Sequence, residues 1–192
     1  MSGKTIPCPY RFAWALDLPF RRWAYRFVLD RLRLRSGMIA LEVGAGTGAF
    51  TLPAARRVAP TGKVIAIDVQ PEMIMQIEQR VEHAGITNVE TYVAGAYELP
   101  LEDGSVDCAF FIAVLGEIAD PHRALNEAFR VLKSGGVLSI TEDFSDPDYY
   151  CPGEIVRLVE GVGFETSERF GGFWLHTLNA RKTDPEPHTQ IL

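Results

Sequence analysis

The feature that most constrains this chain is a set of three alternating glycines, at positions 44, 46 and 48. The apolar run before them, residues 38–43, predicts a buried strand, and residues 49–58 predict a helix. Glycine allows positive φ and lets a ligand approach the main chain, while the start of a helix presents unpaired N–H groups. A strand, a glycine turn and a helix in this order predict the nucleotide-binding edge of an open α/β sheet.

Two classes of site use this geometry. Gly44, Gly46 and Ala49 fit the G-x-G-x-x-A pattern of dinucleotide sites, which leaves an NAD-dependent oxidoreductase open. Glu42, Gly44, Gly46 and Gly48 also fit E-x-G-x-G-x-G, which resembles motif I of the class I S-adenosylmethionine (SAM)-dependent methyltransferases. SAM carries an ammonium and a sulfonium but no pyrophosphate. A carboxylate at the strand end therefore suits SAM, whereas it would repel a pyrophosphate.

A second acidic residue, Asp68, ends the next expected strand, residues 63–67, and lies 24 residues beyond Gly44. An acid near this distance takes the ribose hydroxyls in nucleotide-binding α/β folds, and a carboxylate can accept two hydrogen bonds from a diol. Val69 and Met73 follow it, around the start of a helix opened by Pro71, and are expected beside the cofactor, with Met73 against adenine.

The loop at residues 94–107, AGAYELPLEDGSVD, resembles the "GDAEELPFPDGSFD" stretch of small-molecule methyltransferases, including the quinone-biosynthesis type. In that family an acid usually binds the adenine amino group where this chain has Gly95. We therefore expect adenine recognition to rest on Gly95, on the backbone of Ala96 and on Tyr97. Residues 130–142, RVLKSGGVLSITE, match the family's "RVLKPGGxLxIxE".

The fourth expected strand, residues 108–113, ends at the ligand crevice. The resemblance implies that Ile112 and Ala113 line the methionine part of SAM. Glu117 stands where the family often has histidines near the substrate and is the candidate general base, although a loop or helix-cap acid is the alternative. Tyr149, in an acidic loop after the fifth strand, is a candidate substrate contact.

The resemblance covers residues 38–182 and implies a Rossmann-like α/β fold. Its sheet would have seven mixed strands, the last antiparallel, with helices on both faces. Residues 1–35 are expected to form an arm and a helix, residues 20–34, that cap the site, with Tyr10, Arg11 and Trp14 meeting the acceptor. Residues 36–182 would form the SAM-binding domain and residues 183–192 a flexible tail. The other expected elements are strand 89–93, a helix from residue 121 ended by Gly135-Gly136, strand 137–141, helix 152–160 and a hairpin of strands 164–169 and 173–180.

Composition agrees with one ordinary globular domain: of 192 residues, 47% are hydrophobic and 23% charged. Residues 1–35 carry a formal charge of +6 (eight Lys and Arg against two Asp), so the remainder carries −12. An acidic body argues against nucleic-acid binding, while the basic helix suits solvent or peripheral contact with a membrane surface. Three scattered cysteines favour reduced thiols and a cytoplasmic location, and no apolar run is long enough to span a membrane.

The sequence thus predicts transfer of a methyl group from SAM to a small-molecule acceptor by in-line displacement, with S-adenosylhomocysteine as the product. A non-catalytic SAM-binding protein is the other alternative, since fold does not fix function. The four histidines are scattered and no Cys-x-x-Cys occurs, so no metal site is expected. The oligomeric state and the atom that is methylated are not predicted.

Overall fold

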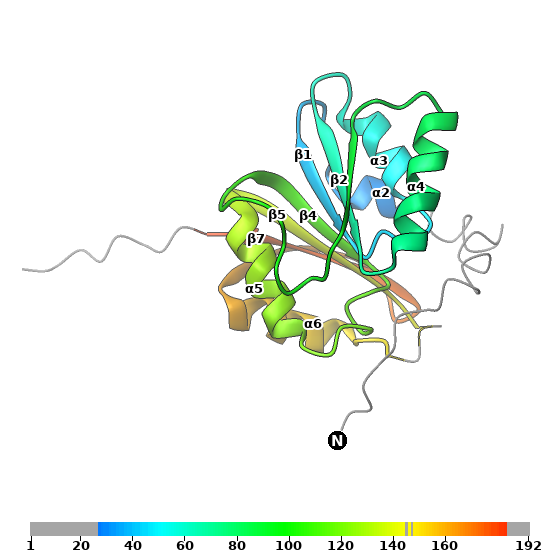
Figure 1. Cartoon of the computed structure of the whole chain (residues 1–192). Helices are drawn as coiled ribbons and strands as arrows, with labels where there is room; N and C mark the ends of the chain where they lie inside the picture. Colours follow the sequence, from blue (N-terminus) through cyan, green and yellow to red (C-terminus); the bar gives the residue numbers. More distant parts are fainter. Residues whose placement is uncertain (1–26, 145, 147, 184–192) are drawn as a thin grey trace, which may run out of the picture.

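The structure, a computed structural model, describes residues 27–144, 146 and 148–183. Seven strands form one sheet in the order β3-β2-β1-β4-β5-β7-β6 (Figure 1). Neighbours from β3 to β5 pair in parallel, and β7 runs antiparallel to both β5 and β6. The strands are β1 Ile39–Val43, β2 Lys63–Asp68, β3 Val89–Val93, β4 Val106–Ile112, β5 Leu132–Asp143, β6 Phe164–Gly171 and β7 Leu175–Lys182.

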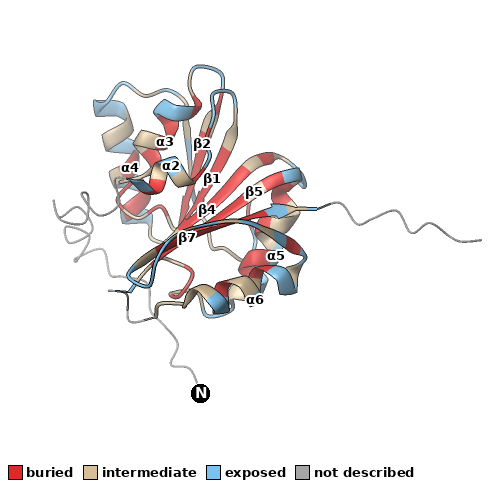
Figure 2. Ribbon diagram, turned by 180° about the vertical axis from the view of Figure 1, so that it is seen from behind, coloured by how far each residue is buried: buried red, intermediate tan, exposed pale blue. Residues whose placement is uncertain are grey.

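Helices cover both faces of the sheet, as Figures 1 and 2 show from opposite sides. One face carries α2 Val28–Arg31, α3 Thr51–Val58 and α4 Pro71–His83; the other carries α5 Pro121–Val131 and α6 Pro152–Val162. The sheet between them is largely buried (Figure 2). The predicted fold, a seven-stranded mixed sheet whose last strand is antiparallel, is confirmed.

Successive side chains of a strand point to opposite faces of the sheet, and this alternation produces two core layers. In β4, Ala109 and Phe111 point to the α5 and α6 layer, whereas Cys108 and Phe110 point to the α2 and α3 layer. Parallel strands that are buried on both faces read as continuous apolar runs, which is why residues 38–43 stand out in the sequence.

Several element boundaries differ from the sequence expectations: β4 ends at Ile112 rather than at residue 113, and β7 begins at Leu175 rather than at residue 173, while the largest differences concern two helices. The helix expected to run to Gly135 ends at Val131, and β5 begins at Leu132 because Leu132 already has extended backbone (ψ 137°). Gly135 and Gly136 therefore lie within a strand, with φ +71° at Gly135. The helix expected over residues 20–34 is described only from Phe27 onward, and α2 ends at Arg31.

Candidate functional site

A cavity of about 840 Å³ opens at the carboxyl ends of β1, β2 and β4. The strand order reverses between β1 and β4, and this switch point is where open α/β sheets bind ligands. Every residue predicted from the sequence to bind the cofactor lines this cavity: Glu42, Gly44, Ala45, Gly46, Gly48, Asp68, Val69, Met73, Gly95, Ala96, Tyr97, Ile112 and Ala113. The structure brings them together; their role in binding SAM remains a prediction.

The glycine turn is tied to the end of β2. The amides of Gly44 and Ala45 both donate to the carbonyl of Ile67, at 2.8 and 3.0 Å. Gly44 has φ +72°, and a Cβ atom there would lie 2.3 Å from Cγ2 of Val114. Glycine is therefore required at position 44 by its backbone conformation and by the side chain packed against it.

Glu42 lies at the base of the cavity and is 3% exposed. The pKa of its carboxyl group is raised to about 8: burial is the largest cause, a 2.5 Å hydrogen bond from the hydroxyl of Thr51 acts to lower the pKa, and the charge of Asp68 adds to the rise. A buried acid of this kind is stabilised in its charged form by a cation, and the ammonium group of SAM is a cation of suitable size.

Asp68 is held in place by the backbone. Its Oδ2 accepts the amide of Gly46 and its Oδ1 accepts the amide of Gln70, both at 2.9 Å. Burial raises the pKa of Asp68, while the amides of Gln70, Gly46 and Val69 lower it. Each carboxylate oxygen has a further lone pair, so the side chain can still accept hydrogen bonds from a diol.

Arg130 explains why the motif loop and the RVLK run occur together. Its guanidinium donates to the carboxylate of Glu127 at 2.8 Å, to Asp103 at 2.7 Å and to the carbonyls of Leu99 and Leu101. The amide of Leu99 in turn donates to Glu127 at 2.8 Å. These bonds fasten the loop that follows β3 to helix α5, and thereby position the cavity wall.

Tyr97 and Gly95 stand on this wall. The hydroxyl of Tyr97 accepts the amide of Asp120 at 2.8 Å, and the guanidinium of Arg123 lies 4.9 Å from its ring centre. A Cβ atom at Gly95 would meet only Val69, at 3.8 Å. Space for a side chain therefore exists where the family usually has an acid.

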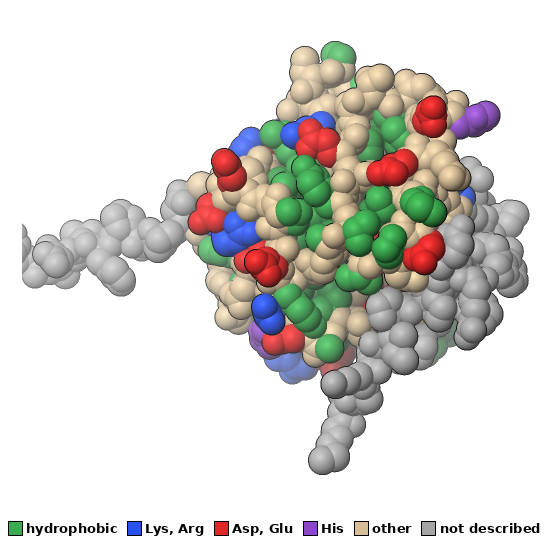
Figure 3. Space-filling model, viewed as in Figure 1, with side chains coloured by type: hydrophobic (Ala, Val, Ile, Leu, Met, Phe, Trp, Pro, Cys, Tyr) green, Lys and Arg blue, Asp and Glu red, His purple; other side chains and the backbone are tan. Residues whose placement is uncertain are grey.

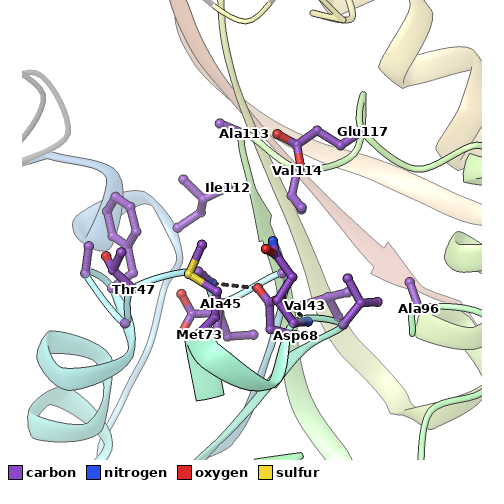
Figure 4. A pocket seen from close by; sticks show the side chains of 18 of the residues that line it. Val43, Ala45, Thr47, Asp68, Met73, Ala96, Ile112, Ala113, Val114 and Glu117 are labelled. Carbon is purple, nitrogen blue, oxygen red and sulfur yellow. Dashed lines mark hydrogen bonds between the residues drawn. The ribbon is translucent and has the colours of Figure 1, made fainter. Parts of the chain in front are cut away.

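The loop after β4 forms the opposite wall. Ala113 has φ +51°, a left-handed conformation that is rare for alanine and is held by a 2.8 Å hydrogen bond from its amide to Thr141. Figure 4 shows the Glu117 side chain beside Ala113 and Val114, away from Asp68. Glu117 lines the cavity, as expected for a residue that meets the acceptor.

The predicted substrate contacts are not all found at the cavity. Tyr149 does not line it: its hydroxyl donates to the carbonyl of Phe173 at 2.7 Å, and its ring packs on Phe144, Phe173 and His176. Because the hairpin turn holds this hydroxyl, the structure gives no support to Tyr149 as a substrate contact. Tyr10, Arg11 and Trp14 lie outside the described residues.

Other lining residues were missed from the sequence. They come from the exposed sides of helices and from loop positions that match no motif, and they include Leu29, Phe50, Arg56, Arg80, Val114 and Ile118. Only the helical spacing of the segments around them could have suggested which of these face the ligand edge.

The described part of the chain contains no group of three or more His, Cys, Asp and Glu side chains arranged to hold a metal ion. Within those same ranges, no helix has the length and apolar character needed to cross a bilayer. Acidic side chains are spread over the face drawn in Figure 3.

Comparison with known proteins identifies the family. Residues 41–140 match the family model described as "Methyltransferase domain", which is more than half of the chain. The chain belongs to the methyltransferase domain family. This result confirms the predicted relationship to class I SAM-dependent methyltransferases and SAM as the cofactor of the family, and it sets the NAD-dependent alternative aside.

Individual relatives agree with the methyltransferase assignment. A solved SAM-dependent methyltransferase from Aquifex aeolicus is 27% identical, with a TM-score of 0.85 over 92% of this chain and 100% of the other. The ubiquinone/menaquinone biosynthesis C-methyltransferase UbiE of Pasteurella multocida is 37% identical over 64% of this chain and 46% of its own length. An uncharacterized 37.1 kDa transposon protein of Streptomyces fradiae is 42% identical over 62% of this chain and 36% of its own. The chain thus spans half or less of the length of these two curated relatives.

Proposed function

We propose that this domain transfers the methyl group of SAM to a small-molecule acceptor. The observation that carries the proposal is the cavity at the β1–β4 switch point, which collects the buried acids and the glycine turn in one place. Its volume, about 840 Å³, is in the upper part of the range of roughly 300–1,000 Å³ typical of small-molecule sites, which supports room for an acceptor beside a cofactor.

The residues present fit SAM by their chemistry. Glu42 and Asp68 are buried carboxylates that line the cavity. The glycines of the turn line it too, and without side chains they leave the main chain accessible to a ligand. In this proposal Asp68 accepts the ribose hydroxyls, Glu42 faces the ammonium directly or through water, and Gly95, Ala96 and Tyr97 surround adenine. When bound, SAM supplies a methyl group that its sulfonium already activates.

The chain itself has to align the acceptor and keep water out. In this proposal Ile112 and Ala113, which line the cavity, would flank the methyl group, and Glu117, which also lines it, would orient the acceptor or take its proton. Leu29, from the described end of the N-terminal segment, also lines the cavity. This supports the proposal that residues 1–35 cap the site, in which Tyr10, Arg11 and Trp14 would contact the acceptor.

Small-molecule acceptors are favoured over nucleic acid because the body of the protein is acidic. The relative named for ubiquinone and menaquinone biosynthesis makes quinone precursors one class to test. A cytoplasmic location and peripheral membrane contact through the basic segment remain predictions of the sequence.

The test is a calorimetric titration of the dialysed protein with SAM, S-adenosylhomocysteine and NAD⁺, followed by transfer from methyl-labelled SAM to a panel of quinols, phenols, amines and small acids. We expect saturable binding of SAM and S-adenosylhomocysteine, no binding of NAD⁺, and labelled product from at least one class. Binding of NAD⁺ alone would overturn the proposal. Tight SAM binding without transfer to any acceptor, in a folded full-length chain, would favour a non-catalytic SAM-binding protein.

A further inference from the structure

A cluster of aromatic rings lies at the turn of the β6–β7 hairpin, and none of its members lines the cavity. We call it the aromatic patch; its members are Phe144, Tyr149, Phe173 and Trp174. The ring centre of Phe144 lies 4.5 Å from that of Phe173 and 4.9 Å from that of Trp174. Phe144 is 42% exposed, Phe173 54% and Trp174 71%. A group of exposed rings of this size marks an interaction surface, because large apolar side chains are mostly buried in folded proteins.

The patch is held in place by the backbone. The amide of Phe144 donates to the carbonyl of Trp174 at 2.9 Å, and the hydroxyl of Tyr149 donates to the carbonyl of Phe173 at 2.7 Å. The turn requires glycine at position 171, where φ is +80° and a Cβ atom would lie 2.1 Å from the carbonyl oxygen of the residue at position 175. The rings are therefore presented to solvent by a hydrogen-bonded turn.

The patch and the cavity lie at the same edge of the sheet. Leu175, which follows Trp174, pairs with Asp143 at the carboxyl end of β5, and β5 runs parallel to β4. In the strand order, β7 lies two strands from β4, which is roughly 10 Å at about 4.8 Å per strand. The patch is therefore a close neighbour of the cavity wall that β4 forms.

The chain enters the described fold beside both features. The first described residue, Phe27, directly precedes helix α2, and Leu29 in that helix lines the cavity. Helix α2 also packs beside β7, and Leu29 and Leu175 contact the same buried cluster. Residues 1–26 are thus attached to the fold next to the cavity and next to the hairpin that carries the patch.

The sequence of residues 10–20, YRFAWALDLPF, has an apolar side chain at every second position. These six side chains are Tyr10, Phe12, Trp14, Leu16, Leu18 and Phe20. In an extended segment this pattern places all of them on one face, which needs an apolar surface to cover it. Seven positions separate Phe20 from Phe27, a stretch that spans up to roughly 23–25 Å when extended. This reach exceeds the spacing of two strands.

We propose that the aromatic patch anchors the chain's own residues 16–20, with Leu16, Leu18 and Phe20 lying on the exposed rings. A tethered segment acts at an effective concentration on the order of millimolar, which favours it over a second molecule that would bind the same patch. The contact goes beyond the proposed function, since it does not require SAM. Within that function, anchoring residues 16–20 at the patch would leave residues 10–14 to continue toward the acceptor end of the cavity.

The test is photo-cross-linking in the full chain. The photoreactive residue p-benzoylphenylalanine replaces Trp174 in one protein and, in the control, Tyr92, an exposed residue of the distant edge strand β3. After irradiation and trypsin digestion, mass spectrometry of mixed ¹⁴N- and ¹⁵N-labelled protein separates links within one chain from links between chains. We expect the probe at position 174 to join the tryptic peptide 12–21 of its own chain at least fivefold more often than the probe at position 92.

A second measurement uses variants of the patch. Phe173→Ser and Trp174→Ser, combined in one protein, remove two exposed rings and leave the buried core unchanged. We expect trypsin to cleave after Arg21 and Arg22 at least fivefold faster in this variant than in the wild type, because the neighbouring segment is no longer anchored. Val93→Ser removes an exposed apolar side chain of β3; it is the matched control and should leave the cleavage rate unchanged. Thermal unfolding of each variant checks that the fold is intact.

The outcomes separate this inference from the proposed function. If the probe at position 174 joins mainly a second copy of the chain, or peptides other than 12–21, the patch has a different occupant and the inference is wrong. Equal yields from positions 174 and 92, or unchanged trypsin cleavage in the doubly substituted variant, would also overturn it. Neither measurement uses SAM. A protein that cross-links as expected but binds no SAM refutes the proposed function alone, and one that binds SAM without the cross-link refutes the docking alone.

Discussion

Gly44→Ala offers a quantitative test of how the glycine turn is built. Gly44 has φ +72°, a conformation that costs an L-residue about 1–2 kcal/mol. The added Cβ atom would also lie 2.3 Å from Cγ2, 3.0 Å from Cβ and 3.1 Å from Cγ1 of Val114. Overpacking of this kind typically costs about 1–3 kcal/mol. The free energy of unfolding should therefore fall by about 2–5 kcal/mol.

A second glycine separates the two contributions. Gly85 has φ +63°, and a Cβ atom there would meet nothing within 4 Å. Gly85→Ala should therefore lower the free energy of unfolding by the backbone cost alone, about 1–2 kcal/mol. Both Gly→Ala changes restrict the unfolded chain to the same extent, so this contribution cancels when the two variants are compared. The steric part should disappear in the double variant Gly44→Ala with Val114→Ala, which should be more stable than the sum of the single effects by about 1–3 kcal/mol.

The assay is urea unfolding of the wild type, the three single variants and the double variant, followed by circular dichroism. The reasoning fails if Gly44→Ala costs no more than Gly85→Ala within about 0.5 kcal/mol, or if the double-variant cycle shows no coupling. Either result would mean that Val114 moves away from position 44 without cost.

Four further predictions concern the site. Asp68→Ala should weaken SAM binding by about 1–3 kcal/mol, and unchanged affinity in calorimetry would contradict its role with the ribose. Gly95→Asp should tighten SAM binding by about 0.5–1.5 kcal/mol, since the position has space for the acid that the family usually carries; weaker binding would argue against adenine lying there. Glu142→Gln should gain stability over the wild type as pH rises from 4.5 to about 8, by at most ~5 kcal/mol, because over this range the carboxyl group ionises in the unfolded state while the native state keeps it protonated; a difference that is flat between urea unfolding at pH 5 and 9 would refute this. Deleting residues 1–15 should leave SAM affinity within a few-fold but remove most methyl transfer, and full turnover would exclude a capping role.

Several features could be read from the sequence because they are local. A glycine turn after a buried strand, an acid at a strand end and a proline that opens a helix depend on a few neighbouring residues, so the candidate cofactor residues from Glu42 to Ala113 could be named in advance and are found around one cavity. Boundaries were less predictable. Gly135 and Gly136 are strong helix-ending signals, yet β5 already begins at Leu132, which pairs with Val106 of β4, and the two glycines lie in the irregular stretch before the pairing resumes at Val137.

The sequence by itself determined the order of the elements, the family and the candidate residues of the cofactor edge, since hydrophobic periodicity and turn chemistry act over short distances. Only the tertiary structure decided which distant residues meet. Arg130 reaches the carbonyls of Leu99 and Leu101 because α5 packs beside their loop. The hydroxyl of Tyr149 donates a hydrogen bond to the carbonyl of Phe173 in the hairpin turn. The charge of Glu117 helps to raise the pKa of Glu142, 25 positions later in the chain, because β4 and β5 pair in parallel and end at the same edge of the sheet. Contacts of this kind follow from strand pairing and packing across the whole sheet, which no short stretch of sequence encodes.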